Sequence, residues 1–328
     1  MHKDVLLPGP RNSIADVPGL LIGNAEDRKV RSGVTVILAE EPCLAVVDLR
    51  GGAPGTRETD LLRPECLVEK IDALVFSGGS AHGLEAAGGV TAALAESGRG
   101  FPAGNFRVPI VPAAILFDLA NGGHKDWGDQ PPYRQLGIDA LKAAAKDFCV
   151  GNAGAGFGAI AGSLKGGLGS ASLTEGNGIT IGAIAAVNSL GETVMSEDGS
   201  FWAWPFEQQG EFGGMAPPSR RPAFGGPISR LRPGTNTTLV AVGTDARLDA
   251  ASAKRLAIMA QDGIAAAVRP AHSPYDGDIL FLLSTGRKVL ADPAADLVRL
   301  GMMASATVAR AIARGVYHAE SLGEQKSW

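Results

Sequence analysis

Cysteine is scarce in this sequence, which has 328 residues and only Cys43, Cys66 and Cys149. Their number is odd, and they are not spaced as metal ligands are. Small secreted domains that depend on disulfides carry a much denser set of cysteines. The sequence therefore predicts a chain without a disulfide framework, folded in a reducing compartment.

Histidine is also sparse, with five in the chain. None is spaced with cysteines or acidic residues as zinc ligands are, so no metal site is predicted. The Gly-x-Ser-x-Gly turn of many serine hydrolases is missing. A Gly-rich turn at 77–83 follows a strand, but it matches neither the dinucleotide fingerprint nor a Walker loop and contains no lysine. We expect no cofactor and interpret this turn as close helix–sheet packing.

No run of lysine or arginine is present, and the formal charge of −4 argues against nucleic acid as a partner. Long hydrophobic runs are missing too. The most apolar later segment, 108–119, is short and is interrupted by Pro112 and Asp118, so no membrane span is predicted. The first ten residues lack the apolar core of a signal peptide. A cytoplasmic location is expected.

Glycine, by contrast, is abundant, with 45 residues and neither a collagen period nor a low-complexity run. Such glycines mark many tight backbone positions. Hydrophobic residues make up 45% of the chain and charged residues 20%, as in a soluble globular protein. A chain of this length forms one large domain or two ordinary ones.

Hydrophobic periodicity predicts an α/β chain. Strands are expected at 34–38, 43–49, 71–76, 179–188, 238–244 and 279–285, with 192–196 returning from the fourth as a hairpin. Helices are expected from Leu84 to about Ala95, within 131–148, from Asp249 to before Pro270, and from Asp292 onward. The order strand, helix, strand, helix makes 237–328 a compact unit that needs further strands to complete its sheet.

The most informative stretch lies where a long Pro/Gly loop, 201–234, gives way to a strand that begins at Thr237. A loop of this length in a compact domain is usually functional, and such loops are where chains are cut. If the Asn236–Thr237 bond is cut, Thr237 gains a free α-amine beside its hydroxyl, which is the N-terminal-threonine form of nucleophilic catalysis. The alternative is that Thr237 and Thr238 are ordinary strand residues, since threonine favours strands.

Four other polar residues are candidates for the same site. Lys165 stands alone among small residues, and Asn188 ends an apolar strand. Each is either an ordinary surface or turn residue or a donor placed where charge develops in a reaction. Asp276 and Asp278 flank a glycine at a strand start, where they either cap a turn or orient the hydroxyl and amine of Thr237.

A set of motifs in a fixed order covers most of the chain, and together they are specific although each alone is not. They are Asp48-Leu-Arg-Gly-Gly-Ala-Pro-Gly-Thr-Arg-Glu-Thr-Asp60, Ser77-Gly-Gly-Ser-Ala-His-Gly-Leu-Glu85, Gly154-Ala-Gly with Lys165-Gly-Gly-Leu-Gly169, Ala186-Val-Asn188, Asn236-Thr-Thr238 and Asp276-Gly-Asp278. In these the chain resembles the autoprocessing aminopeptidase family, which includes L-aminopeptidase D-Ala-esterase/amidase, the β-peptidyl aminopeptidases and the endo-type 6-aminohexanoate-oligomer (nylon-oligomer) hydrolases.

The resemblance implies one domain with a four-layer αββα sandwich, cut by itself at Asn236–Thr237 into an α-chain, 1–236, and a β-chain, 237–328. It places the new Thr237 at the sheet edge as the nucleophile of an amide hydrolase. Lys165 and Asn188 would polarise the carbonyl or hold the oxyanion. The acidic pair, Asp276 and Asp278, would orient the nucleophile.

The implied substrates are short peptides with a free amine or linear 6-aminohexanoate oligomers, and the implied assembly is a homotetramer of cleaved chains. No metal or cofactor is implied. The aminopeptidase branch carries Ser and Glu where this chain has Asp276 and Asp278, whereas the nylon-oligomer branch shares the Asp-Gly-Asp pattern. Phe117 stands where some members have a tyrosine, so an oxyanion role falls to Asn188, Lys165 or backbone amides.

Two other functions stay open at this level. One is acyl transfer of the ornithine-acetyltransferase type, which uses a similar self-cleaved threonine. The other is a non-catalytic binding protein that keeps the fold uncleaved.

Overall fold

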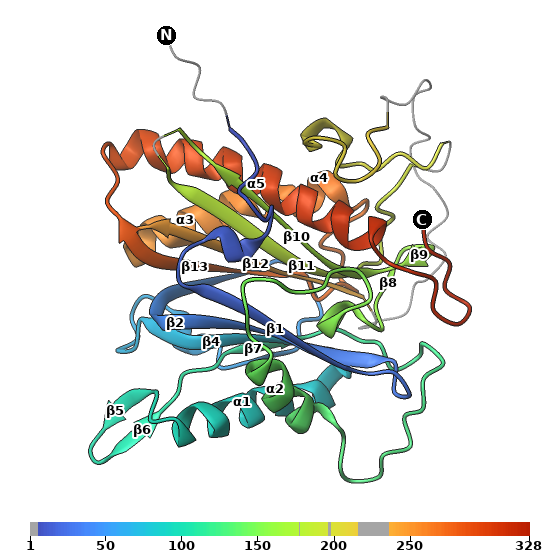
Figure 1. Cartoon of the computed structure of the whole chain (residues 1–328), viewed down its shortest axis with the longest axis horizontal. Helices are drawn as coiled ribbons and strands as arrows, with labels where there is room; N and C mark the ends of the chain where they lie inside the picture. Colours follow the sequence, from blue (N-terminus) through green and yellow to red (C-terminus); the bar gives the residue numbers. More distant parts are fainter. Residues whose placement is uncertain (1–5, 177, 196–197, 216–235) are drawn as a thin grey trace.

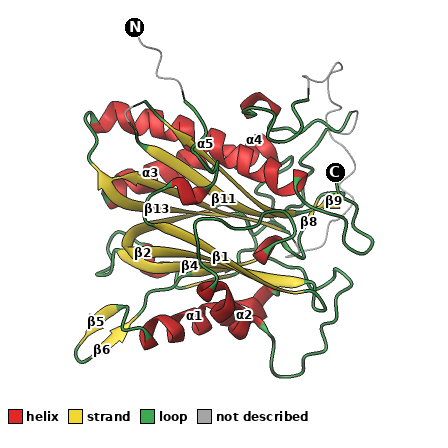
Figure 2. Ribbon diagram, in the orientation of Figure 1, coloured by secondary structure: helices red, strands yellow, loops and turns green. Residues whose placement is uncertain are grey.

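The computed structural model describes residues 6–176, 178–195, 198–215 and 236–328, and these form four layers with helices outside two packed β-layers (Figures 1 and 2). One side is covered by α1 (Glu85–Glu96) and α2 (Tyr133–Lys142), and the other by α3 (Ala250–Ala260), α4 (Asp262–Ala267) and α5 (Pro293–Tyr317). The αββα sandwich is therefore confirmed. None of the described helices is long and apolar enough to cross a membrane.

The strands of both β-layers join, within the described residues, into one nine-stranded folded sheet. One layer holds β1 (Leu20–Asp27), β2 (Ser32–Leu49), β3 (Thr56–Arg57), β4 (Lys70–Ser77) and β7 (Ala113–Ile115); the other holds β10 (Gly167–Thr174), β11 (Thr180–Asn188), β12 (Thr237–Ala246) and β13 (Ile279–Lys288). Two separate hairpins are β5 (Phe101–Ala103) with β6 (Phe106–Val108), and β8 (Ile160–Ala161) with β9 (Leu164–Lys165).

Strand β2 connects the two layers. It pairs antiparallel with β1 and β4 along its first part and with β13 along Leu44–Leu49, and its register against β4 shifts between Leu38 and Cys43. The sequence predicted two strands separated by a turn at 40–42. That prediction was wrong because the irregularity takes up Pro42, which has no N–H for a regular ladder, without ending the strand.

Three hydrophobic cores separate the four layers, and the strands alternate between them. On β12, Leu239 and Ala241 face the core between the two β-layers, whereas Val240 and Val242 face the core under the helices α3–α5. The third core lies between the other β-layer and α1 and α2. A strand with both faces buried is apolar at every position, which explains the continuous apolar runs in the sequence.

Strand β10 was not predicted, because glycine is depleted in strands. The structure supplies the reason for its glycines. A Cβ at Gly169 would lie 2.0 Å from Ala311 O, and one at Gly167 would lie 2.2 Å from Gly315 O, both on α5. The glycines of β10 therefore let the long helix lie directly on the sheet.

The predicted hairpin at 192–196 does not form in the described residues. Glu192 makes an isolated bridge with Arg269, and Val194 makes one with Phe201. The helix predicted from Asp249 is divided into α3 and α4 at Gln261. Of the long Pro/Gly loop, 201–215 is described and contains a short 3₁₀ turn, whereas 216–235 lies outside the described residues.

A buried ion pair fastens α5 to the rest of this half. Arg310 is fully buried, and its Nε lies 2.5 Å from Glu211 Oε1. Its Nη1 donates to Ser172 O on β10 at 2.8 Å, and its Nη2 donates to Asn12 Oδ1 at 2.8 Å. One guanidinium thus joins the helix, the sheet, the N-terminal segment and the described part of the long loop.

Replacing Glu211 by Gln is expected to lower the free energy of unfolding by about 3 kcal/mol, because the buried Arg310 loses its counter-charge. The exposed pair of Arg287 and Glu40, 3.2 Å apart, provides the control. Glu40→Gln should change stability by less than about 1 kcal/mol. Denaturant unfolding of both variants measures the difference, and equal losses would contradict this account of the buried pair.

Candidate active site

The site predicted from the sequence lies at one end of three neighbouring strands. Thr237 is the first residue of β12 and pairs directly with Asn188, the last residue of β11. On the other side, Asn236 forms a parallel bridge with Asp276, just before β13. Because β12 lies between β11 and β13, Thr237 begins an inner strand of the sheet.

The carbonyl that precedes Thr237 is held between two donors. The Thr237 hydroxyl donates to Asn236 O at 2.5 Å, and the backbone N–H of Gly277 donates to the same oxygen at 2.8 Å. Asn236 and Thr237 are both buried, at 6% and 4% exposure. The hydroxyl therefore lies beside the very peptide bond that it would have to attack.

Asp278 fixes the start of β12 through its carboxylate. Oδ1 accepts the N–H of Thr238 at 2.7 Å, while Oδ2 accepts the backbone N–H of His272 at 3.0 Å and lies 3.0 Å from His272 Nδ1. His272 has a positive φ of 59°, and this backbone conformation brings its N–H and its ring onto one carboxylate oxygen. Asp278 thus links the start of β12 to the turn before β13.

Asp276 is held from the opposite side. Its Oδ2 accepts the N–H of Ser273 at 2.8 Å, and its Oδ1 accepts the N–H of Leu190 at 3.4 Å. Burial raises the pKa of Asp276, and the nearby Asp278 carboxylate raises that pKa further. The two acids predicted from the sequence are thus brought together beside Thr237, each with different partners.

The Gly-rich loop after β2 supports this acidic turn with its backbone. The N–H of Ala53 donates to Asp276 O at 2.8 Å, and the N–H of Gly51 donates to Asp278 O at 3.1 Å. A Cβ at Gly51 would lie 2.3 Å from Asp276 O, so glycine is required for this contact. The loop therefore packs directly against the turn that carries the two acids.

Lys165 is buried on β9, at 1% exposure, and is connected to Asn188 through the β8–β9 hairpin. Ile160 pairs with Lys165, and its N–H donates to Asn188 Oδ1 at 2.9 Å. Lys165 Nζ donates to Gly166 O at 2.6 Å and to Gly156 O at 3.1 Å. Burial lowers the pKa of Lys165 to about 7, against the opposing effect of the Asp118 carboxylate.

Phe117, which stands where some family members have a tyrosine, contributes its backbone oxygen to the candidate site. Asn188 Nδ2 donates to Phe117 O at 3.1 Å. The next residue, Asp118, is buried, and its Oδ1 accepts the N–H of Gly79 at 2.7 Å. The Gly-rich turn at 77–83 therefore donates a backbone hydrogen bond to the Asp118 carboxylate. Burial raises the pKa of Asp118.

The model of peptidase family S58 matches residues 12–327.

This chain belongs to peptidase family S58.

Among its relatives in this family, an uncharacterized aminopeptidase of Mycobacterium tuberculosis is 41% identical over 331 residues, which is 94% of each protein. A 6-aminohexanoate-oligomer endohydrolase of Kocuria sp. is 28% identical over 278 residues, covering 82% of this chain and 74% of the relative. Membership of S58 and these relatives support a hydrolase of amide bonds.

Two solved structures share the fold. A Burkholderia sp. β-aminopeptidase has a TM-score of 0.70 at 22% identity, covering 98% of this chain and 91% of that one. The L-aminopeptidase D-Ala-esterase/amidase of Ochrobactrum anthropi has the same TM-score and identity, covering 97% and 89%, and is described as a variant of the Ntn hydrolase fold. The S58 chain therefore has this Ntn-type architecture.

Two residues of the candidate site, Asp118 and His272, were not predicted from the sequence. Asp118 had a signal, because a carboxylate inside an otherwise apolar run is either buried with partners or out of place. His272 had no signal in the sequence beyond its position four residues before Asp276. Its role became visible only when the turn brought its ring to Asp278.

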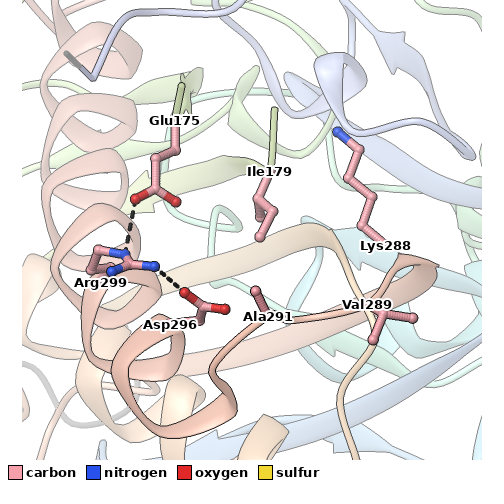
Figure 3. Close-up of a pocket in the computed structure, with 7 residues that line it drawn as sticks. All are labelled: Glu175, Ile179, Lys288, Val289, Ala291, Asp296 and Arg299. Atoms are coloured by element: carbon pink, nitrogen blue, oxygen red, sulfur yellow. Dashed lines mark hydrogen bonds and ion pairs between the residues drawn. The ribbon is translucent and has the colours of Figure 1, made fainter. Parts of the chain in front are cut away.

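A cavity of about 450 Å³ lies beside Lys288, at the opposite end of β13 from Asp278. Figure 3 shows the residues that line it. Arg299 lies 2.9 Å from Glu175 there and also pairs with Asp296, while Lys288 lies 3.0 Å from Asp245. The charged groups around this cavity are thus paired with one another. The candidate site around Thr237 lies at the other end of these strands.

The lowered pKa of Lys165 predicts a pH-dependent stability. Between about pH 7 and its ordinary pKa of 10.5, the unfolded chain binds a proton that the folded chain does not. Lys165 therefore destabilises the fold fully below pH 7, and this penalty disappears as the pH rises toward 10.5. The resulting slope reaches at most about 1.4 kcal/mol per pH unit.

Lys165→Met is expected to remove this slope, whereas Lys146→Met, at an exposed position, should retain it. Free energies of unfolding measured between pH 7 and 10 provide the comparison. The prediction is wrong if the two variants show the same dependence on pH.

Proposed function

We propose that this chain cleaves its own Asn236–Thr237 bond and then hydrolyses amide bonds with Thr237 as an N-terminal nucleophile. One observation carries the proposal. The Thr237 hydroxyl lies 2.5 Å from Asn236 O, on a carbonyl that also accepts the N–H of Gly277. A threonine that only forms part of a strand needs no hydrogen bond to the carbonyl before it. Nor does it need the polar residues gathered at this end of the sheet, which are Lys165, Asn188, Asp276 and Asp278.

In the self-cleavage step, Thr237 Oγ attacks the carbonyl carbon of Asn236. The C–N bond breaks, and the proton lost by the hydroxyl ends on the Thr237 nitrogen. The product is an ester between Asn236 and Thr237 Oγ, together with a free α-amine. Water then hydrolyses the ester, which leaves a carboxylate on Asn236 and restores the Thr237 hydroxyl.

In substrate turnover the new α-amine takes the proton from Oγ as the hydroxyl attacks the substrate carbonyl. The leaving amine departs with a proton, and water hydrolyses the acyl ester. Asn188 is the cross-strand partner of Thr237, and its amide, with Lys165, polarises the carbonyl or holds the oxyanion. A lysine with a pKa of about 7 carries part of its charge at neutral pH.

The acidic pair orients the nucleophile. Asp278 accepts the N–H of Thr238 and so fixes the residue that follows the nucleophile. Asp276 lies across from Asn236, and burial raises its pKa above that of an ordinary carboxyl group. These roles rest on position, since the turn before β13 lies beside the start of β12.

Short peptides with a free amine are the proposed substrates, ahead of linear 6-aminohexanoate oligomers. The aminopeptidase relatives are 41% identical over 94% of the chain, whereas the oligomer endohydrolases are 28% identical over 82%. This chain resembles the oligomer hydrolases in its Asp-Gly-Asp turn, so 6-aminohexanoate oligomers are the second proposed substrate.

We also propose a cytoplasmic enzyme that assembles as a homotetramer of cleaved chains. The three cysteines are free, and Cys149 is exposed, which suits a reducing compartment. The assembly follows from the family resemblance.

Purified protein is expected to run on a denaturing gel as two fragments, one of which begins at Thr237 by mass and N-terminal sequence. Thr237→Ala should stay full-length and inactive, because it has no attacking oxygen. Thr238→Val is the matched control, since the Thr238 hydroxyl is buried without a hydrogen-bond partner in the described residues. This control should still cleave itself. Wild-type protein that stays full-length would overturn the proposed function.

Processed enzyme is expected to hydrolyse an aminoacyl anilide with a higher kcat/KM than a β-peptide or a 6-aminohexanoate oligomer. The same anilide with an acetylated amine is the control, and it should lose at least about tenfold, since a charged hydrogen bond is worth about 1.5–3 kcal/mol. Chromogenic release and mass spectrometry measure these rates. Equal rates with the free and acetylated anilides would remove the aminopeptidase assignment while leaving an amide hydrolase.

A further inference from the structure

The backbone N–H of Gly277 points at the carbonyl that self-cleavage would convert. It donates to Asn236 O at 2.8 Å, while the Thr237 hydroxyl lies 2.5 Å from the same oxygen. Donor, acceptor and attacking group therefore already lie together in the uncleaved chain. A donor to a peptide carbonyl is also a donor to the oxyanion that forms when a nucleophile adds to that carbonyl.

Space, and not backbone conformation, requires glycine at 277. Gly277 is not among the glycines with a positive φ, so its conformation is open to other residues. A Cβ there would lie 2.6 Å from Thr237 Oγ1 and 2.9 Å from Ala53 O. Any side chain would displace the nucleophile from its position beside the carbonyl.

Both neighbours of Gly277 are held in place, which fixes the direction of its N–H. Asp276 O accepts the N–H of Ala53 at 2.8 Å, and Asp278 O accepts the N–H of Gly51 at 3.1 Å. The Asp278 side chain accepts the N–H of Thr238 at 2.7 Å. A donor held in this way needs little reorganisation when charge develops, and this is the main source of electrostatic catalysis.

The side-chain donors of the site are directed to other oxygens. Asn188 Nδ2 donates to Phe117 O at 3.1 Å, and Lys165 Nζ donates to Gly156 O and Gly166 O. A backbone N–H also keeps its proton at every working pH, whereas Lys165, with its pKa near 7, does not.

We propose that the Gly277 N–H is the oxyanion donor for self-cleavage. This rests on the proposed function and adds a residue to it. When Thr237 Oγ adds to the Asn236 carbonyl carbon, the oxygen takes the negative charge and the Gly277 N–H stabilises it. The charge returns to a carbonyl as the C–N bond breaks and the Thr237 nitrogen takes the proton. Self-cleavage, the first reaction of the chain, would thus use the Gly277 N–H as its oxyanion donor.

Replacing Gly277 by glycolic acid tests this role, because it turns one amide into an ester. The change removes the N–H and also weakens the Asp276 carbonyl as an acceptor for the Ala53 N–H. Cell-free synthesis with the hydroxy acid allows the fragment beginning at Thr237 to be followed by mass over time. Loss of one oxyanion donor is expected to slow its appearance roughly 100-fold or more.

The matched control is glycolic acid at Gly178, whose N–H donates to Glu175 O at 2.7 Å at the far end of the sheet. This ester removes a hydrogen bond of similar length, and its cleavage should stay within about threefold of wild type. A Gly277 ester that cleaves as fast as the Gly178 ester overturns the proposal and leaves the proposed function standing. Wild-type protein that does not cleave overturns the proposed function itself.

A second measurement does not depend on the folding of an ester variant. In the full-length Thr237→Ala protein, the Gly277 amide should exchange with deuterium at least about tenfold more slowly than an unbonded amide. Fast exchange at Gly277 would show that its N–H does not hold the Asn236 carbonyl, and would overturn the proposal.

Discussion

The pairing of β12 on both of its sides is the constraint on which the rest of the site depends. Thr237 faces Asn188 in an antiparallel ladder, and Asn236 faces Asp276 in a parallel one. A shift of one residue would turn the Thr237 side chain to the other face of the sheet. With two ladders in register, the junction peptide has one position, and the hydroxyl lies at its carbonyl.

Other parts of the chain reach this junction through backbone hydrogen bonds. The β8–β9 hairpin brings Lys165 to Asn188 through the N–H of Ile160. The loop after β2 holds the turn that contains Asp276 and Asp278 through the N–H groups of Gly51 and Ala53. Glycine is needed at such contacts because two backbones meet without room for a side chain. The high glycine content of the chain is thus partly explained by its site.

Burial shapes the electrostatics of this junction. It lowers the pKa of Lys165 to about 7 and raises those of Asp118 and Asp276, so each group is moved toward its neutral form. Backbone N–H groups and carbonyls supply many of the hydrogen bonds that these side chains would make with water. Shifted pKa values of this kind are common where proteins carry out proton transfer.

Much of the fold was predictable because most inner strands and the helices have strong hydrophobic patterns. The strands ending at Asn188 and beginning near Thr237 were recognised from apolar runs, which both faces of a buried strand require. Strand β10 was missed, since its glycines reflect contact with α5 and not local preference. The hairpin at 192–196 was wrongly predicted because Glu192 instead bridges to Arg269, a partner distant in sequence.

The sequence by itself determined the apolar strands, the loop-to-strand junction at Asn236–Thr237 and the motifs of the family. These are local patterns, and residue type and spacing are enough to reveal them. Only the tertiary structure decided that Thr237 begins an inner strand, that the ring of His272 lies against Asp278, and that Gly277 donates to the Asn236 carbonyl. Those facts depend on which strands pair and in what register, which is settled by packing across the whole chain.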